Sequence, residues 1–320
     1  MMKCLSCYRP SENDYCLSCR KKLFNKKRVS SRLQFELAGI DIETNQVYPL
    51  CLNDKKLEWF DQEKISSSRE FNAYYFVKVN PFEGQFKKNH DLIENEHLTL
   101  QIADQVYGIQ TVANALIYTA NDIPAFIYRR YDLTQDKNSC AEDFEQLSHK
   151  VKVMMGSDFH FDGNYEEVAK LIKKYVSAYL PALEELFKRV IFNYLFSVTH
   201  LSFKDFSIIK TTTGECKLAP AHHLFNMQIH DDRNLDTQLN MYKDIHTSSQ
   251  LSMQRYLKQA HFLEFADRIG IMKKRALRIL NQFQDIEQPV IELVQLSFLK
   301  ETTRMQYIEM FKRKLSHLQG

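Results

Sequence analysis

The chain has 320 residues, of which 44% are hydrophobic and 26% are charged. This composition predicts ordinary globular folding around one large core or two lobes, and it excludes a mainly disordered protein. The 43 basic and 40 acidic residues nearly cancel, so the net charge of +3 does not by itself indicate a nucleic-acid or membrane partner. No run of about 18 apolar residues is present, and the first ten residues lack the apolar stretch of a signal peptide, so we expect a cytoplasmic protein.

Four cysteines near the start of the chain form two Cys-x-x-Cys pairs, namely Cys4, Cys7, Cys16 and Cys19. Four thiolates complete the tetrahedral coordination of a structural Zn²⁺ ion, and each pair presents two of them. The spacing therefore predicts a zinc knuckle over residues 1–30. Two other interpretations stay open, a reducible disulfide pair and free thiols.

Short strands and one long helix are expected over residues 31–133, which we take as a first lobe. Strand-like stretches end in the alternating residues 74–79, and these predict a small sheet. From residue 94 to residue 107, apolar side chains occupy two helical faces, which indicates a helix buried on two sides. A strand pair at residues 114–118 and 125–128 follows.

Helices dominate the prediction for residues 134–320. Asn164 and Glu167 form a capping-box-like helix start, with Asn in place of Ser or Thr. A second helix is expected to begin after Pro181. Strands at 206–210 and 216–219 flank a glycine-containing turn, which predicts a hairpin. The fold class is therefore α+β, with a largely helical second lobe.

The order of elements from residue 71 onward is that of a protein-kinase-like fold. In such a fold, a strand lysine holds the nucleotide phosphates and a glutamate from the following helix positions it. Lys78 and Glu96 suit these two roles. Either residue alone would be interpreted as an ordinary strand lysine or a solvated helix glutamate.

Six segments in the same order resemble the HipA-like Ser/Thr kinases of bacterial toxin–antitoxin modules, particularly short members with a zinc knuckle. They are ENEHLT at 94–99, AFIYRRYD at 125–132, FNYLF at 192–196, Lys204 with Phe206 and Ser207, LAPA at 218–221 and RIGI at 268–271. The resemblance covers nearly the whole chain. It implies a two-lobed kinase-like fold, ATP and Mg²⁺ as ligands, and nucleotide contacts from Tyr128 and Arg129 beside Lys78 and Glu96.

The same resemblance implies partners. Relatives work with a HipB-like helix-turn-helix antitoxin and, in split systems, with a small subunit that corresponds to the HipA N-terminal subdomain. No DNA-reading element is evident in this chain, so direct nucleic-acid binding is not expected.

The residues that carry chemistry in this family are replaced here. After FNYLFS, relatives read Asn-Gly-Asp-Ala-His-Leu-Lys-Asn, in which Asp is the catalytic carboxylate and the last Asn binds metal. In this chain His200 stands at the Asp, Ser202 at the His and Asp205 at that Asn, whereas Lys204 is kept. In the next loop, His223 stands at an Asp that holds magnesium in relatives.

The phosphate loop has also changed, because residues 45–52 (NQVYPLCL) lack the glycine and lysine of the corresponding segment in relatives. Mg²⁺ prefers oxygen ligands, so an imidazole at His223 is a poor substitute for a carboxylate. The leading hypothesis is a HipA-like pseudokinase, a regulatory or partner-binding component of a toxin–antitoxin-type module, with or without a bound nucleotide.

Several alternatives stay open. One is an active Ser/Thr kinase toxin with rearranged catalytic and metal ligands, and another is a transferase that binds nucleotide in an inverted orientation. A third is a zinc-knuckle scaffold for nucleic acid, because a basic run follows the cysteines from Arg20 to Arg28. We favour the interpretation that this run offsets the charge of four thiolates. A last hypothesis is a new Zn²⁺ or Mn²⁺ site made by His200, Asp205, His222 and His223.

Overall fold

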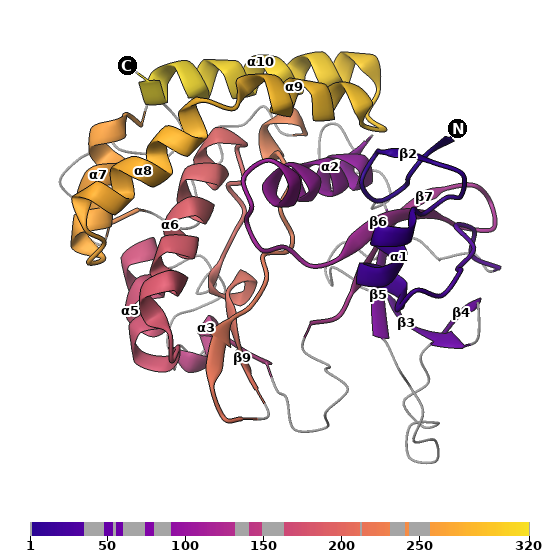
Figure 1. The fold of residues 1–320 in the computed structure, drawn as a ribbon, viewed down its shortest axis with the longest axis horizontal. Helices are drawn as coiled ribbons and strands as arrows, with labels where there is room; N and C mark the ends of the chain where they lie inside the picture. Colours follow the sequence, from indigo (N-terminus) through magenta and orange to yellow (C-terminus); the bar gives the residue numbers. More distant parts are fainter. Residues whose placement is uncertain are drawn as a thin grey trace.

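Two lobes make up the protein, a sheet-containing lobe near the N-terminus and a helical lobe near the C-terminus (Figure 1). The computed structural model describes residues 2–34, 48–53, 56–59, 74–79, 91–131, 141–148, 163–211, 213–230, 241–242 and 257–319. Within these ranges, no helix is both long enough and apolar enough to cross a lipid bilayer.

A five-stranded antiparallel sheet with the strand order β4-β3-β5-β7-β6 forms the centre of the first lobe. Its strands are β3 (Tyr48–Asn53), β4 (Lys56–Trp59), β5 (Tyr74–Val79), β6 (Asn114–Tyr118) and β7 (Pro124–Arg129). The predicted strands at 74–79, 114–118 and 125–128 are confirmed. Since β5 is central, Lys78 lies in the middle of the sheet rather than at an edge.

Helix α2 (Leu92–Gln105) packs against β6 and β7 on one side and against the helical lobe on another. The predicted helix is confirmed, and it is more deeply enclosed than its pattern indicated, because residues 95–103 are all buried. Several of these residues are polar. Buried polar side chains need hydrogen-bond partners, so the polar side of α2 ties it to its surroundings.

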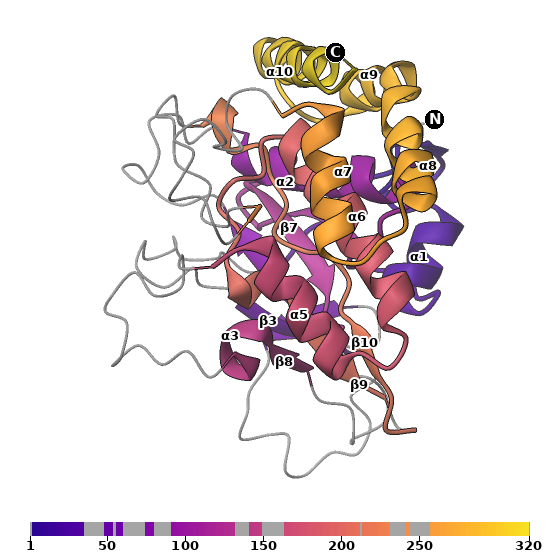
Figure 2. The same ribbon diagram turned by 90° about the vertical axis from the view of Figure 1, so that its left-hand side faces the viewer.

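In the described part of the second lobe there are six longer helices: α5 (Tyr165–Tyr175), α6 (Tyr179–Leu195), α7 (Gln259–Arg268), α8 (Lys273–Gln284), α9 (Glu287–Leu296) and α10 (Glu301–Gln319). Helix α5 packs on α6, and α7 packs on α8 (Figure 2). The predicted cap is confirmed, since Asn164 Oδ1 accepts the Glu167 N–H at 2.9 Å. The predicted start of α6 was wrong. The helix begins at Tyr179, and Pro181 lies in its first turn, where a missing N–H costs no intrahelical hydrogen bond.

The predicted hairpin is also confirmed. Strands β9 (Ser207–Lys210) and β10 (Cys216–Leu218) pair through a turn in which Gly214 has a φ of +85°. Strand β8 (Ala141–Asp143) adds to β9, and the short helix α3 (Phe144–Leu147) follows it. The 3₁₀ helices η3 (Phe203–Asp205) and η4 (Met227–Ile229) lie on either side of this hairpin in the sequence.

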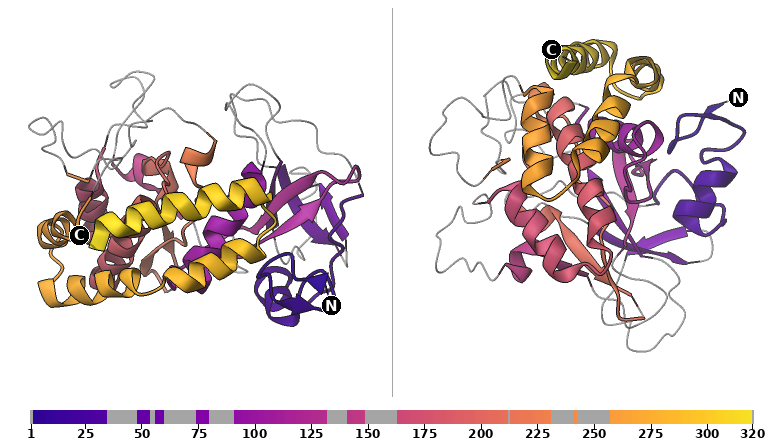
Figure 3. Two further views of the ribbon diagram at one scale, coloured as in Figure 1. Left: turned by 90° about the horizontal axis from the view of Figure 1, so that it is seen from above. Right: turned by 60° about the vertical axis from the view of Figure 1, so that its left-hand side comes forward.

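The N-terminal segment folds as a hairpin of β1 (Met2–Lys3) and β2 (Pro10–Ser11) followed by α1 (Leu17–Phe24). Seen from above, α9 and α10 extend from the helical lobe across α2 toward this segment (Figure 3). The last helices of the chain therefore connect the second lobe to the first.

Candidate functional site

The first half of the candidate site is an ion pair between the sheet and α2. Lys78 Nζ on β5 donates to Glu96 Oε1 on α2 at 2.7 Å, and the two side chains are 18% and 5% exposed. The ammonium also faces the rings of Phe126 and Tyr128, at 5.8 and 5.7 Å from their centroids. The structure thus brings together the two residues that the sequence predicted as a nucleotide-positioning pair.

Buried side chains hold α2 against the segment that follows His223. Asn95 donates from Nδ2 to the Asn226 carbonyl at 2.9 Å and accepts the Asn226 N–H at 3.0 Å. One turn later, the Thr99 hydroxyl lies 2.8 Å from the Tyr307 hydroxyl on α10. These bonds fix the register of Glu96 relative to the helical lobe.

Tyr128 and Arg129, predicted to contact nucleotide, point to opposite faces of the sheet. In the β5–β7 register, Lys78 lies opposite Phe126 and Phe76 lies opposite Tyr128, so Tyr128 shares the face of Lys78. Arg129 lies on the other face, where Nη1 donates to Asn25 Oδ1 at 2.8 Å. Its nucleotide role remains a prediction that its position does not favour.

The guanidinium of Arg130 lies 4.6 Å from the centroid of the Phe76 ring. Since Phe76 and Lys78 share one face of the sheet, Arg130 lies on that face too. Sequence reasoning missed this residue, although strand alternation was the signal that could have found it. The predicted phosphate loop is only partly described. Residues 45–47 lie outside the described residues, and the remainder belongs to β3, which pairs with β4 and β5.

The second half of the site contains the replaced catalytic and metal positions. Asp205 ends η3, and its Oδ2 accepts hydrogen bonds from Ser202 N at 2.7 Å and from Ser202 Oγ at 3.1 Å. His223 Nδ1 donates to Asp205 Oδ1 at 3.1 Å. Both carboxylate oxygens therefore have partners from the protein itself. Burial alone would raise the pKa of Asp205, but the His223 hydrogen bond and nearby imidazoles hold that pKa below its ordinary value.

His200, at the position of the catalytic aspartate, turns toward the backbone. Its Nε2 donates to the His223 carbonyl at 2.8 Å, and its ring stacks on Phe225 with centroids 3.9 Å apart. A carbonyl only accepts, so Nδ1 carries the lone pair, and this atom is buried without a partner. Burial, reinforced by His223, lowers the pKa of His200 to about 3. The imidazole is therefore neutral at physiological pH.

His222 and Lys204 complete this half of the site. The His222 ring lies 5.4 Å from that of Tyr131, and burial lowers the pKa of His222. Lys204 Nζ lies 3.5 Å from Glu145 Oε2, with half of the lysine side chain exposed. In the described part of the chain, the His200, Asp205, His222 and His223 set does not bring three potential ligand atoms together, whereas one other set does. The hypothesis of a metal site at these four residues stays a prediction without support from this arrangement.

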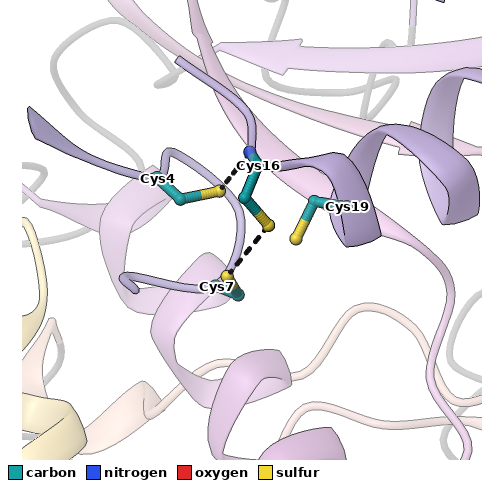
Figure 4. Close-up of side chains that lie close together, drawn as sticks. All are labelled: Cys4, Cys7, Cys16 and Cys19. Carbon is teal, nitrogen blue, oxygen red and sulfur yellow. Dashed lines mark hydrogen bonds between the residues drawn. The ribbon is translucent and has the colours of Figure 1, made fainter. Parts of the chain in front are cut away.

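That other set is the four cysteines of the N-terminal segment. Their sulfur atoms lie within 4.8 Å of one another, and Figure 4 shows them directed at a common centre. The Sγ atoms of Cys7 and Cys16 are 3.8 Å apart. Zn–S bonds of about 2.3 Å place the corners of a tetrahedron about 3.8 Å apart, so this donor set fits a tetrahedral ion. Hydrogen bonds from Cys19 and Cys7 lower the pKa of the Cys4 thiol, whereas the hydrogen bond to Cys4 raises the pKa of Cys19. Metal binding to the four residues would therefore release protons.

Comparisons with known proteins agree with this geometry. A family model described as the HipA-like C-terminal domain matches residues 55–290. A Haemophilus influenzae protein named "Putative kinase" is 24% identical over 288 residues, which cover 83% of this chain and 81% of that protein.

Solved structures share the fold. The HipA chain in a complex of Shewanella oneidensis HipA, HipB and operator DNA matches with a TM-score of 0.64 at 16% identity, covering 90% of this chain and 66% of the HipA chain. The Helicobacter pylori proinflammatory kinase CtkA matches with a TM-score of 0.52 at 14% identity, covering 88% of this chain and 95% of CtkA. At these identities the likeness concerns the fold alone.

Proposed function

The chain belongs to the HipA-like C-terminal domain family, and from this premise we propose that it is a pseudokinase of that family. In this proposal it is a regulatory or partner-binding component of a toxin–antitoxin-type module. A HipB-like antitoxin is the partner that the Shewanella complex supports by resemblance. A small subunit similar to the HipA N-terminal subdomain is a second proposed partner.

The bonding of Asp205 to His223 is the observation that carries the proposal. Phosphoryl transfer depends on metal ions that neutralise the phosphates and on a carboxylate that accepts the proton of the attacking hydroxyl. Both oxygens of Asp205 already accept hydrogen bonds, and the second metal position is an imidazole that donates one of them. The base position holds a neutral imidazole bonded to a backbone carbonyl. Because both oxygens of Asp205 are already occupied by hydrogen bonds, this carboxylate gains little from Mg²⁺.

Nucleotide binding is a separate part of the proposal, and the Lys78–Glu96 ion pair supports it. A lysine held by a buried carboxylate presents its remaining donors in a fixed position, as phosphate binding requires. We propose that ATP binds at this half of the site without productive metal coordination.

Structural zinc is the third part of the proposal. The four thiols fit a tetrahedral ion, and such an ion supplies folding free energy to a segment too short to form a core of its own. Its chemistry would be structural, because all four coordination positions belong to the protein.

Restoring the family residues tests the loss of catalysis. Purified protein is incubated with labelled ATP and Mg²⁺ or Mn²⁺, beside the triple variant His200→Asp, Asp205→Asn and His223→Asp. We expect no measurable transfer or hydrolysis from the unmodified chain and at least about a hundredfold more from the triple variant, the usual contribution of a positioned base. The matched control is His222→Tyr, because relatives carry Tyr-Asp where this chain has His222 and His223, and of these two it is the Asp that holds magnesium. Equal and rapid transfer by the unmodified chain would refute the pseudokinase proposal.

Thermal shifts with ATP test the nucleotide half. A ligand that binds only the folded state stabilises it in proportion to RT ln(1 + [L]/Kd), so saturating ATP raises the melting temperature. We expect this shift with and without Mg²⁺, and Lys78→Met should remove most of it. If ATP does not raise the melting temperature of the unmodified chain, the proposed nucleotide binding is wrong, and only the partner-binding role stands.

A further inference from the structure

The zinc-knuckle segment, residues 2–24, holds α2 directly beside Glu96. Tyr8 OH lies 2.8 Å from His97 Nδ1, and the two rings meet edge to face with centroids 5.1 Å apart. Both residues are at most 2% exposed. Farther along the helix, Gln105 Nε2 donates to the carbonyl of Cys7 at 3.4 Å. The knuckle thus contacts α2 at the residue next to the ion pair and again at the last turn.

The same segment is attached to the sheet. The Leu116 N–H on edge strand β6 donates to the Leu5 carbonyl at 2.9 Å, and Tyr15 OH donates to the Leu116 carbonyl at 2.8 Å. The hydroxyl of Ser6 donates to the Asn114 carbonyl at 2.7 Å. The knuckle is therefore fixed to the first lobe independently of its contact with α2.

Its third attachment is to the helical lobe. Lys3 Nζ donates to the carbonyls of Leu296 and Ser297 at the C-terminal end of α9, at 2.6 and 3.2 Å. A cation at a helix C-terminus is favoured by the helix dipole. The same ammonium lies 4.1 Å from the centre of the Phe298 ring, which also contacts the ring of Tyr8 at 5.6 Å.

Tyr8 contacts both lobes, because its side chain meets His97 on α2 and Phe298 beyond α9. It directly follows the thiol ligand Cys7 and has a φ of +64°, a left-handed conformation that is costly for a residue with a Cβ atom. Backbone bonds of the knuckle turn hold it there: Tyr8 N donates to the Cys4 carbonyl, and Cys4 N donates to the Arg9 carbonyl. A strained residue of this kind persists only while its surroundings fix it. Here the surroundings are the turn from Cys4 to Arg9, which carries two of the four clustered thiols.

A second contact with the α9–α10 connection is made by Asp91, the residue that precedes α2. Asp91 Oδ2 accepts hydrogen bonds from Lys300 N at 3.1 Å and from Thr303 Oγ1 at 2.7 Å, at the start of α10. The segment from α9 to α10 is thereby bound on one side by the knuckle and on the other by the residue that precedes α2.

We propose that the metal-loaded knuckle is an interlobe clamp, which acts through Tyr8 to fix α2, and with it the Lys78–Glu96 pair, against the α9–α10 connection. Loss of the metal releases the turn that holds Tyr8, leaves His97 without its partner inside the protein and loosens the connection between the lobes. Metal occupancy then controls whether the nucleotide half of the site is formed. The clamp rests on the proposed zinc site, but it does not depend on the loss of kinase chemistry.

Hydrogen exchange read by mass spectrometry tests the clamp without any measurement of activity. Zinc-loaded protein, with one equivalent of zinc verified by elemental analysis, is compared with protein stripped by a chelator. We expect exchange to become faster in peptides covering α2 and residues 296–304, while α5 is unchanged. Faster exchange confined to residues 2–24 would overturn the proposal.

A pair of matched variants covers the case in which stripping the metal unfolds the chain. Tyr8→Phe removes the hydroxyl bonded to α2, whereas Tyr15→Phe removes an equally buried knuckle hydroxyl that bonds only to β6. With zinc retained in both, we expect α2 to exchange about tenfold faster in Tyr8→Phe than in Tyr15→Phe, since the first leaves a buried imidazole nitrogen without its partner. Equal exchange of α2 in the two variants would overturn the clamp, whatever the outcome of the phosphoryl-transfer experiment.

Discussion

The two halves of the candidate site differ in where their polar groups find partners. Lys78 and Glu96 come from different elements, and their ion pair connects the sheet to α2. In the other half, Asp205 is bonded to Ser202 in its own turn and to His223 in the next loop. The first half holds the lysine ammonium in a fixed position, whereas in the second half both oxygens of Asp205 are already occupied by groups of the protein. This contrast is what a protein that binds nucleotide without transferring phosphate would need.

The largest expected effect comes from breaking the first half. Glu96→Ala leaves the Lys78 ammonium, which is 18% exposed, without its carboxylate. Removing one partner of a buried pair costs about 3 kcal/mol of the free energy of unfolding. Urea denaturation of the two proteins measures this difference, and a loss below about 1 kcal/mol would show that the pair does not stabilise the fold.

The double variant Lys78→Met with Glu96→Leu is the control for that measurement. Apolar side chains of similar volume often replace a buried ion pair at little cost, so we expect most of the lost stability to return. If it does not return, the defect of Glu96→Ala lies in packing rather than in an unpaired charge.

A smaller effect is expected from pH in the second half. His200 has an ordinary pKa of 6.5 in the unfolded chain and a pKa of about 3 in the folded protein, because burial disfavours its charged form. Between these values the unfolded chain binds a proton that the folded protein does not, so stability falls as the pH is lowered through this window. His200→Gln keeps a donor for the His223 carbonyl but removes the titration. The loss of stability from pH 7 to pH 5 should therefore be smaller in this variant by about 2 kcal/mol. Identical pH profiles for both proteins would contradict the burial of His200 as a neutral imidazole.

The smallest effect is expected at Lys204, the retained residue of the catalytic loop. Its ammonium lies 3.5 Å from Glu145, and the lysine side chain is 52% exposed. Exposed ion pairs of this kind contribute little, so Lys204→Met should change the free energy of unfolding by less than about 0.5 kcal/mol. A loss as large as that of Glu96→Ala would place Lys204 in the structural core of the site and weaken the contrast between its halves.

Much of the fold follows from local patterns in the sequence. The two-sided apolar pattern predicted α2, Asn164 predicted the start of α5, and the turn around Gly214 predicted a hairpin. Paired Cys-x-x-Cys spacing predicted the cluster of four thiols. These signals come from residues close in the sequence, so they do not depend on how the lobes meet.

What the sequence could not provide is the set of partners chosen by tertiary packing. The hydrogen bond between Tyr8 and His97 could not be predicted from residue spacing, because 89 positions separate the two residues. The resemblance indicated that His223 stands where relatives have a metal-binding Asp. Only the structure shows that His223 is hydrogen-bonded to Asp205. The resemblance implied a nucleotide contact from Arg129, but the register of β5 and β7 places Arg129 on the sheet face opposite to Lys78.

The attachment of the knuckle to β6 also bears on solubility. Strand β6 is the last strand of its sheet, and an exposed edge offers unpaired N–H and C=O groups to any other chain. The N–H of Leu116 is bonded to Leu5 and its carbonyl to the Tyr15 hydroxyl. Farther along the strand, the N–H of Tyr118 is bonded to Ser31 and its carbonyl to Leu33. Under the proposed zinc site, a chain stripped of metal would expose part of this edge, so chelator-treated preparations are expected to self-associate through β6.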